Sequence, residues 1–153
     1  MRAYVFTVIL AALLAAAGCQ SKDKEKSAQA VPEPDYITVQ HVLIGFQGSL
    51  PGKNVERTRE EAARLAQTLF ERAKSGEDFG KLVQEFTDDS YPGIYKMANF
   101  GVEPDMANGV YARDRMVRAF GDTGFPLDVG EVGLAEYDSA ASKYGWHIIK
   151  RVE

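Results

Sequence analysis

The chain has 153 residues, with 18 basic and 22 acidic side chains and a formal net charge of −4. This acidic balance argues against a basic nucleic-acid-binding surface, so no nucleic-acid partner is expected. The single cysteine has no second cysteine with which to form an intramolecular disulfide. The part that begins at residue 36 has the size of one ordinary domain, which we place at 36–153.

The N-terminus reads "MRAYVFTVILAALLAAAGC", with one positive charge at Arg2 and an apolar run from Ala3 to Ala17. A basic start, an apolar run and small residues are typical of a secretory signal peptide. A membrane-spanning helix needs roughly 18 to 20 apolar residues, so a retained anchor helix is the weaker interpretation. We therefore predict a signal peptide over 1–18 and an exported protein.

Cys19 follows directly after "AAG", and this arrangement resembles the lipobox of bacterial lipoproteins. The resemblance implies that Cys19 is lipidated, although Ala16 stands where the lipobox usually has leucine. The alternative is a stray cysteine near an ordinary cleavage site. In a two-membrane bacterium, Gln20 implies anchoring in the outer membrane, facing the periplasm. Each buried methylene of the anchor would contribute about 0.8 kcal/mol.

The segment that follows, "QSKDKEKSAQAVPEP", has no aromatic residue and almost no apolar side chain to bury. Ordering such a segment costs conformational entropy without burial in return. We therefore predict a flexible tether over 19–35.

The domain is expected to begin with a strand in "YITVQHVLIGF", where apolar residues alternate and His41 shares a face with aliphatic residues. A helix is expected next, because Thr58 and Glu61 form a capping-box pattern and Gly76 supplies a stop. A shorter helix is expected after the cap candidate Asp78. Both helices present an apolar stripe that can pack on a sheet.

The stretch "TDDSYPGIYKMANFGVEPDMANGVY" is rich in Gly, Pro, Asn and Asp, and we predict a loop with one short strand near Val110. A third helix is expected over "ARDRMVRAF". The last strands, "EVGLAEYD" and "GWHIIKRVE", are joined by a tight turn and should pair antiparallel. The pattern predicts an α+β domain in which three to four helices pack on a small, mainly antiparallel four-stranded sheet.

Four separated blocks, in the right order, resemble parvulin-type peptidyl-prolyl cis/trans isomerases. These blocks are "ITVQHVLIGF", "EEAARLAQTLFERAKSGEDFGKLVQEFTDD", "MVRAFGDTGFPLDVGEVG" and "YGWHIIKRVE". They cover most of 36–153. The resemblance implies the parvulin fold and catalysed rotation about X-Pro bonds, with no cofactor and no metal.

The resemblance also implies a site. His41 and His147 match two histidines that lie side by side beneath the substrate pocket, and a facing neutral pair can hydrogen-bond to each other. Asp89 matches the position beside the reacting bond, and Met116 and Phe120 match residues that hold the proline ring. Without the resemblance, the histidines and the apolar pair read as core residues, and Asp89 as part of a solvated turn.

One segment departs from the family pattern. "DMANGVY" replaces a glycine-rich segment that supplies a pocket leucine, which puts Asn108 at the leucine position. Tyr144 stands where a serine or threonine is common. The altered segment Asp105–Gly109 leaves the catalytic rate open.

We expect a monomeric, lipid-anchored isomerase that assists unfolded or folding proline-containing envelope proteins. The alternative is a parvulin-fold chaperone or envelope-assembly module with little catalysis. A third hypothesis, a metal site made of His41, Asp89 and His147, has the right ligand types but no ligand motif in its spacing.

Overall fold

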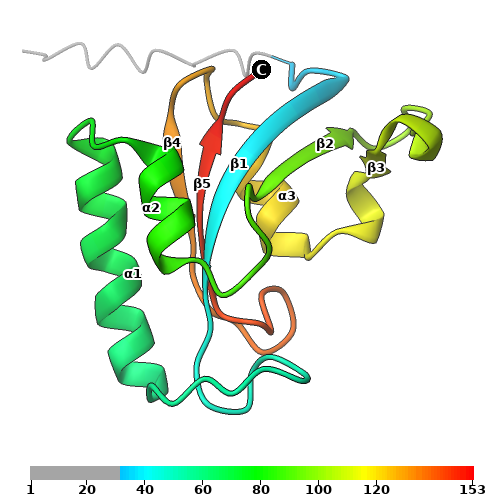
Figure 1. The fold of residues 1–153 in the computed structure, drawn as a ribbon. Helices are drawn as coiled ribbons and strands as arrows, with labels where there is room; N and C mark the ends of the chain where they lie inside the picture. The colour runs from blue at the N-terminus through cyan, green and yellow to red at the C-terminus, as the bar shows by residue number, and fades with distance from the viewer. Residues whose placement is uncertain (1–31) are drawn as a thin grey trace, which may run out of the picture. The chain divides into compact units, whose positions relative to one another are not determined.

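The structure is a computed structural model that describes residues 32–153. The predicted signal peptide, Cys19 and most of the predicted tether lie outside the described residues. Within the described range, five strands and three α-helices follow one another (Figure 1). The strands are β1 (Tyr36–Ile44), β2 (Ile94–Ala98), β3 (Val110–Ala112), β4 (Val132–Ala135) and β5 (Trp146–Arg151). The α-helices are α1 (Arg59–Lys74), α2 (Phe79–Phe86) and α3 (Arg118–Gly124), and short 3-10 helices cover Met106–Asn108 and Arg113–Arg115.

The strands form one sheet in the order β3-β2-β1-β5-β4. β1 is central and pairs antiparallel with β2 and β5, while β4 pairs antiparallel with β5. The edge strand β3 pairs parallel with β2. The α+β class and the mainly antiparallel sheet are confirmed. The described sheet has five strands instead of the four predicted, and the β2–β3 pair makes it mixed.

Helices cover both faces of the sheet, with α1 and α2 on one face and α3 on the other (Figure 1). Successive side chains of a strand point to opposite faces. Val42 of β1 therefore packs in the core beneath α1 and α2, whereas Val39 packs in a second core with Phe120 of α3. His41 has the same parity as Val39, which directs it toward α3.

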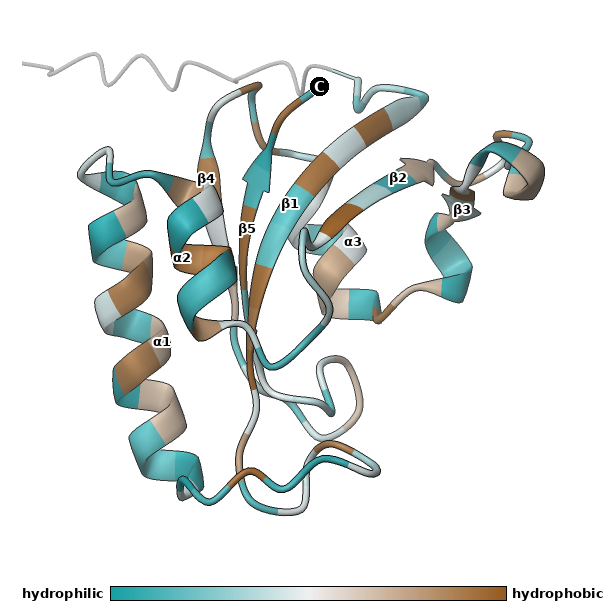
Figure 2. Cartoon of the chain, viewed as in Figure 1, coloured by the Kyte–Doolittle hydropathy of each residue, from teal (hydrophilic) through white to brown (hydrophobic). Residues whose placement is uncertain are grey.

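The two predicted helices in the first half of the domain are present. Thr58 Oγ1 accepts a hydrogen bond from Glu61 N at 3.2 Å, and Glu61 Oε2 accepts one from Thr58 N at 2.8 Å. The capping box is thus complete, and Asp78 caps α2 by accepting from Lys81 N. Hydrophobic bands recur along α1 in Figure 2, as expected for a helix with one buried stripe. No helix among residues 32–153 is both long enough and apolar enough to cross a membrane.

The third predicted helix, over 112–120, is divided in the structure. A 3-10 turn covers Arg113–Arg115, Met116 is extended, and α3 begins only at Arg118. Arg113 lies beside α3, because its guanidinium donates to Asp122 Oδ1 at 3.0 Å. This contact holds the 3-10 turn against the side of α3, so the turn does not continue into the helix.

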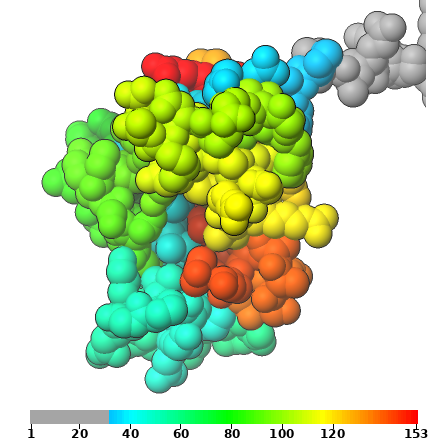
Figure 3. Space-filling model, turned by 90° about the vertical axis from the view of Figure 1, so that its right-hand side faces the viewer, coloured from blue at the N-terminus to red at the C-terminus, as the bar shows by residue number. Residues whose placement is uncertain are grey.

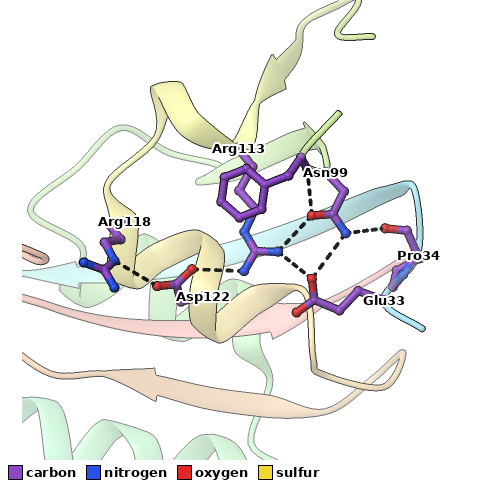
Figure 4. A network of polar contacts seen from close by, with 7 residues as sticks. Glu33, Pro34, Asn99, Arg113, Arg118 and Asp122 are labelled. Carbon is purple, nitrogen blue, oxygen red and sulfur yellow. Dashed lines mark hydrogen bonds and ion pairs between the residues drawn. The ribbon is translucent and has the colours of Figure 1, made fainter. Parts of the chain in front are cut away.

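Arg113 is the centre of a polar cluster that also contains Glu33, Asn99 and Asp122, here called the Arg113 cluster (Figure 4). Arg113 is 8% exposed. Its Nη1 donates to Glu33 Oε2 at 2.6 Å and to Asn99 Oδ1 at 2.9 Å. Glu33 belongs to the predicted tether, so the end of that segment contacts the domain.

Candidate active site

A cavity of about 330 Å³ opens on the α3 side of the sheet. Ligand pockets have volumes of roughly 300 to 1,000 Å³, so this cavity suits a short stretch of peptide. In Figure 3 it lies between the loop after β1, the turn before β5 and the segment that leads into α3. The five residues predicted to catalyse or to hold the proline ring line it: His41, Asp89, Met116, Phe120 and His147.

The two histidines meet at the floor of the cavity. β1 and β5 are antiparallel neighbours, and the register pairs His41 with Ile149 and Leu43 with His147. The histidines are therefore diagonal neighbours on one face, and their rings stack with an interplanar angle of 14°. The Nδ1 atoms of the two rings are 3.2 Å apart, which is hydrogen-bonding distance. Both side chains are buried.

Asp89 lies at the other end of this pair and receives two side-chain hydrogen bonds on one oxygen. His41 Nε2 is 3.0 Å from Asp89 Oδ2, and the hydroxyl of Tyr95 donates to the same oxygen at 2.8 Å. Asp88, the preceding residue, has a different task. Its carboxylate accepts from Gly45 N at 2.8 Å and pairs with Arg57, which fixes the loop after β1. Both aspartates line the cavity, but the Asp88 carboxylate is engaged by the loop after β1, whereas Asp89 is held by His41 and Tyr95.

The pKa values in this cluster follow from burial and hydrogen bonding. The hydrogen bond from His41 holds the pKa of Asp89 well below its usual range, and the Tyr95 hydroxyl lowers it further against the effect of burial. Burial lowers the pKa of His147 to about 3, with a further contribution from His41. Burial and the neighbouring Asp89 raise the pKa of Tyr95 to about 12. At neutral pH Asp89 is therefore ionised, while His147 and Tyr95 are neutral.

Met116 and Phe120 form an apolar side of the cavity. Phe120 is 2% exposed, and its ring meets those of His41 and His147 edge to face, at centroid distances of 5.0 and 5.5 Å. Met116 is half-buried and comes from the extended segment just before α3. The apolar side and the carboxylate of Asp89 thus border the same space.

The rim of the cavity comes from two loops. Leu50, Pro51 and Lys53 belong to the loop after β1, and Tyr144 belongs to the turn before β5. The loops are joined because Ser49 Oγ donates to the carbonyl of Tyr144 at 2.9 Å. Tyr144, which stands where serine or threonine is common in the parvulin-type family, is therefore a rim residue here.

Sequence reasoning missed Tyr95. The residue lies in β2, within a stretch that was predicted as loop because Gly, Pro and Asn surround it. Tyr95 and Met97 are more buried than Ile94 and Lys96, an alternation over only five residues. Asn108, assigned to the pocket-leucine position, is exposed in a 3-10 helix and does not line the cavity. That assignment is wrong, and Tyr95 occupies the wall next to His41.

The third hypothesis concerned a metal ion held by His41, Asp89 and His147. The two Nδ1 atoms face each other at 3.2 Å, so they are engaged with one another. Among residues 32–153, no group of three or more His, Cys, Asp or Glu side chains is arranged to hold a metal ion.

Comparison with known proteins places this site in a family. Residues 19–153 match the PPIC-type PPIASE domain. The chain is 32% identical to Chaperone SurA of Chromohalobacter salexigens over 113 residues, which are 73% of this chain and 21% of that protein. It is 34% identical to Foldase protein PrsA of Geobacillus kaustophilus over 114 residues, or 74% of this chain and 30% of that protein. The chain thus spans less than a third of the length of these relatives.

Solved structures agree with the fold. The solution structure of TbPIN1 aligns with a TM-score of 0.56 at 20% identity, covering 78% of this chain and 98% of that one. Peptidyl-prolyl isomerase ESS1 from Candida albicans aligns with the same TM-score at 23% identity, covering 80% of this chain and 66% of that one. Since the family match extends over most of the sequence, the chain belongs to the parvulin family, the PPIC-type peptidyl-prolyl isomerases.

Proposed function

We propose that this protein catalyses cis/trans isomerisation of X-Pro peptide bonds in client polypeptides. The observation that carries the proposal is the cavity in which an apolar side, formed by Met116 and Phe120, adjoins the ionised carboxylate of Asp89. Membership of the PPIC-type family supports this activity, because the family match rests on the sequence and not on the geometry of the cavity.

The chemistry follows from the electronic structure of the amide. Resonance gives the planar X-Pro bond partial double-bond character, places negative charge on the carbonyl oxygen and makes rotation cost roughly 20 kcal/mol. A twisted amide has lost this resonance, so its oxygen carries less negative charge. An anion beside the oxygen raises the energy of the planar forms more than that of the twisted form, which lowers the barrier between them.

The site residues take distinct parts in this mechanism. Met116 and Phe120 hold the proline ring fixed, so that the residue before proline rotates relative to it about the X-Pro bond. Asp89 supplies the negative charge at the carbonyl. His41 and His147 form the floor and hold Asp89 in place through the hydrogen bond at 3.0 Å. Rotation breaks no covalent bond, so the proposed mechanism needs neither a nucleophile nor a cofactor.

A protease-coupled assay on X-Pro peptides tests the proposal. We expect the double variant His41→Ala, Phe120→Ala to lower kcat/KM by roughly two orders of magnitude, a loss typical of removing pre-organised groups from an active site. Val129→Ala is the matched control, because Val129 is 65% exposed and does not line the cavity. Equal rates for wild type and the double variant would end the proposal.

We also propose that the protein acts outside the cytoplasm, anchored through a lipid on Cys19, on folding envelope proteins. The signal-peptide pattern over 1–18 and the names of the relatives, a chaperone and a foldase, support this placement. Labelling cells with a radioactive fatty acid tests the anchor. Label should enter the wild-type protein and be absent from a Cys19→Ser variant, and label in both would refute lipidation at this residue.

A second candidate function is chaperone action without substantial catalysis, which the name Chaperone SurA of a 32% identical relative favours. Suppression of the aggregation of a proline-free client discriminates the two. A pure chaperone would protect this client and show no rate enhancement on X-Pro peptides. The isomerase proposal predicts a rate enhancement that depends on Phe120.

A further inference from the structure

Tyr95 is held in the cavity by packing on three sides. It lies on β2 opposite Val39 of β1, which directs its ring toward α3. Its ring meets His41 at a centroid distance of 5.2 Å and Phe120 at 5.8 Å, both edge to face. The ring of Tyr111 lies 6.2 Å away on the edge strand β3. These contacts fix where the hydroxyl of Tyr95 can point.

The hydrogen bonds around Asp89 dictate the positions of the protons. An ionised carboxylate only accepts hydrogen bonds, so both Tyr95 and His41 must donate to Asp89 Oδ2. In its neutral form a histidine has a single N–H, and in His41 the bond to Asp89 places that N–H at Nε2. Its Nδ1 is therefore an acceptor, and His147 must donate from its own Nδ1 across the 3.2 Å contact.

The far nitrogen of His147 completes the description. Its Nε2 is buried and has no hydrogen-bond partner among residues 32–153. With the proton of His147 placed at Nδ1, this nitrogen is a bare acceptor. The hydrogen bonds thus all point the same way: His147 donates to His41, and His41 donates to Asp89. Within the described residues, Tyr95 supplies the only other side-chain donor to the Asp89 carboxylate.

We propose that Tyr95 is a positioning residue for isomerisation, which keeps Asp89 ionised and the histidine pair in this single proton arrangement. The inference rests on the proposed function. With one donor removed, the carboxylate attracts a proton to the site more strongly. A proton on the Asp89 carboxylate would remove the charge that accepts from both Tyr95 and His41, so the direction of the hydrogen bonds through the histidine pair would no longer be fixed.

Few other charged groups face this cluster. Among residues 32–153, Lys53 and Asp88 are the other charged residues that line the cavity, and Lys53 donates to the carbonyl of Asp88. The Asp88 carboxylate is already paired with Arg57. Met116, Val117 and Phe120, in and just before α3, bring no charge to the cavity. Apart from His41, the hydroxyl of Tyr95 is therefore the group whose removal changes the surroundings of Asp89 most directly.

The pH dependence of kcat/KM on X-Pro peptides tests this inference. Tyr95→Phe should move the acid limb of the profile upward by roughly half to one pH unit, the shift that a hydrogen bond of ordinary net strength produces. Tyr111→Phe is the matched control, because it removes a neighbouring hydroxyl that does not contact Asp89. A Tyr95→Phe profile that superimposes on the wild-type profile would overturn the inference.

A double variant shows whether Tyr95 acts through Asp89. Asp89→Asn removes the charge, so adding Tyr95→Phe to it should leave the profile of the single Asp89→Asn variant unchanged. An equal upward shift in both backgrounds would mean that the ring itself, and not the hydrogen bond to Asp89, controls the site. That outcome would contradict the proposed role.

Nitrogen-15 NMR of the histidine side chains gives a readout that needs no activity. Wild type should show His41 protonated at Nε2 and His147 protonated at Nδ1, and Tyr95→Phe should raise the pH at which this pattern disappears. If the wild type catalyses no isomerisation but the NMR pattern shifts, the proposed function fails while the role of Tyr95 in proton placement stands. If the pattern is the same in both proteins, the inference fails even where activity is present.

Discussion

Two buried clusters contact α3, and they handle charge in opposite ways. In the Arg113 cluster, a buried guanidinium binds two carboxylates, those of Glu33 and Asp122 (Figure 4). The guanidinium also lies 4.5 Å from the ring centres of Phe100 and Phe125. In the cavity, the carboxylate of Asp89 is held by His41 and Tyr95, and no Lys or Arg side chain hydrogen-bonds to it within the described residues.

The difference indicates what each cluster is for. Arg113 faces two carboxylates, and one of them, Asp122, is also paired with Arg118, so two cations and two anions offset each other's field. The cluster therefore projects little potential and joins three parts of the chain. Neutral donors stabilise a carboxylate while leaving its net charge in place. Asp89 can therefore act on a substrate carbonyl in the cavity, whereas Arg113 stabilises the fold around α3. Each of the following predictions tests this division.

The largest expected effect on stability is at Arg113. Arg113→Met should lower the free energy of unfolding by about 3 kcal/mol, because it leaves two carboxylates facing each other without their cation. Urea denaturation measures this change. Arg118→Met is the matched control, since Arg118 also bonds to Asp122, at 3.4 Å, but its side chain is 80% exposed. The control should change stability by about 0.5 kcal/mol or less. Equal effects of the two variants would show that burial of Arg113 does not matter.

The next effect concerns acid and the cavity. The pKa of His147 is lowered to about 3 in the folded protein, against roughly 6.5 in an unfolded chain. Between these two pH values the unfolded chain binds more protons than the folded protein does. The contribution of His147 to the free energy of unfolding is therefore complete above pH ~6.5 and declines as the pH falls toward 3. We expect the free energy of unfolding to drop by on the order of 2 kcal/mol from pH 7 to pH 4.

A variant separates this effect from general acid sensitivity. His147→Phe removes the titrating group, so its stability should depend less on pH over the same range. The Val129→Ala variant should keep the wild-type slope, since it changes an exposed side chain and no ionisable group. Parallel slopes for wild type and His147→Phe would contradict the assignment of the acid response to the cavity.

A smaller effect is expected at Glu33. Glu33→Gln keeps the shape of the side chain but removes the charge that faces Arg113, and Asp122 remains as its partner. We expect a loss of about 1 kcal/mol in low salt, with less loss in high salt because Glu33 is half-exposed. Glu56→Gln, at an exposed position, is the control. A loss no larger than that of the control would mean that Glu33 is not part of the folded domain.

These clusters also show what the sequence could and could not predict. The histidines, Phe120 and the first two helices follow from regular alternation, from helix caps and from spaced blocks that resemble one family. Regular patterns of this kind are strong local signals because period and capping depend on neighbouring residues. The placement of His41 and His147 side by side needed the family resemblance, since 106 positions separate them.

β2, Tyr95 and the Arg113 cluster could not be predicted from the sequence, for physical reasons. β2 has only five residues, too few for a period to stand out against the surrounding Gly, Pro and Asn. β3 coincides with the short strand predicted near Val110. β2 pairs with β1, which is more than 50 residues away along the chain, and no local pattern records such a long-range contact. Missing β2 meant missing Tyr95, and it also led to the misplacement of Asn108. The Arg113 cluster depends on Glu33, which composition alone assigns to a tether.

The smallest expected effect is at Asn108 and tests whether the altered segment Asp105–Gly109 limits catalysis. Asn108 is exposed outside the cavity, and its side chain donates to Asp105 Oδ2 at 2.6 Å. Asn108→Leu, which inserts the residue common in the family, should therefore leave kcat/KM on X-Pro peptides within about twofold of wild type, since exposed substitutions away from a site have small effects. A rate increase of tenfold or more would show that this segment reaches the substrate after all. It would also transfer the role of cavity wall from Tyr95 back to the 105–109 segment.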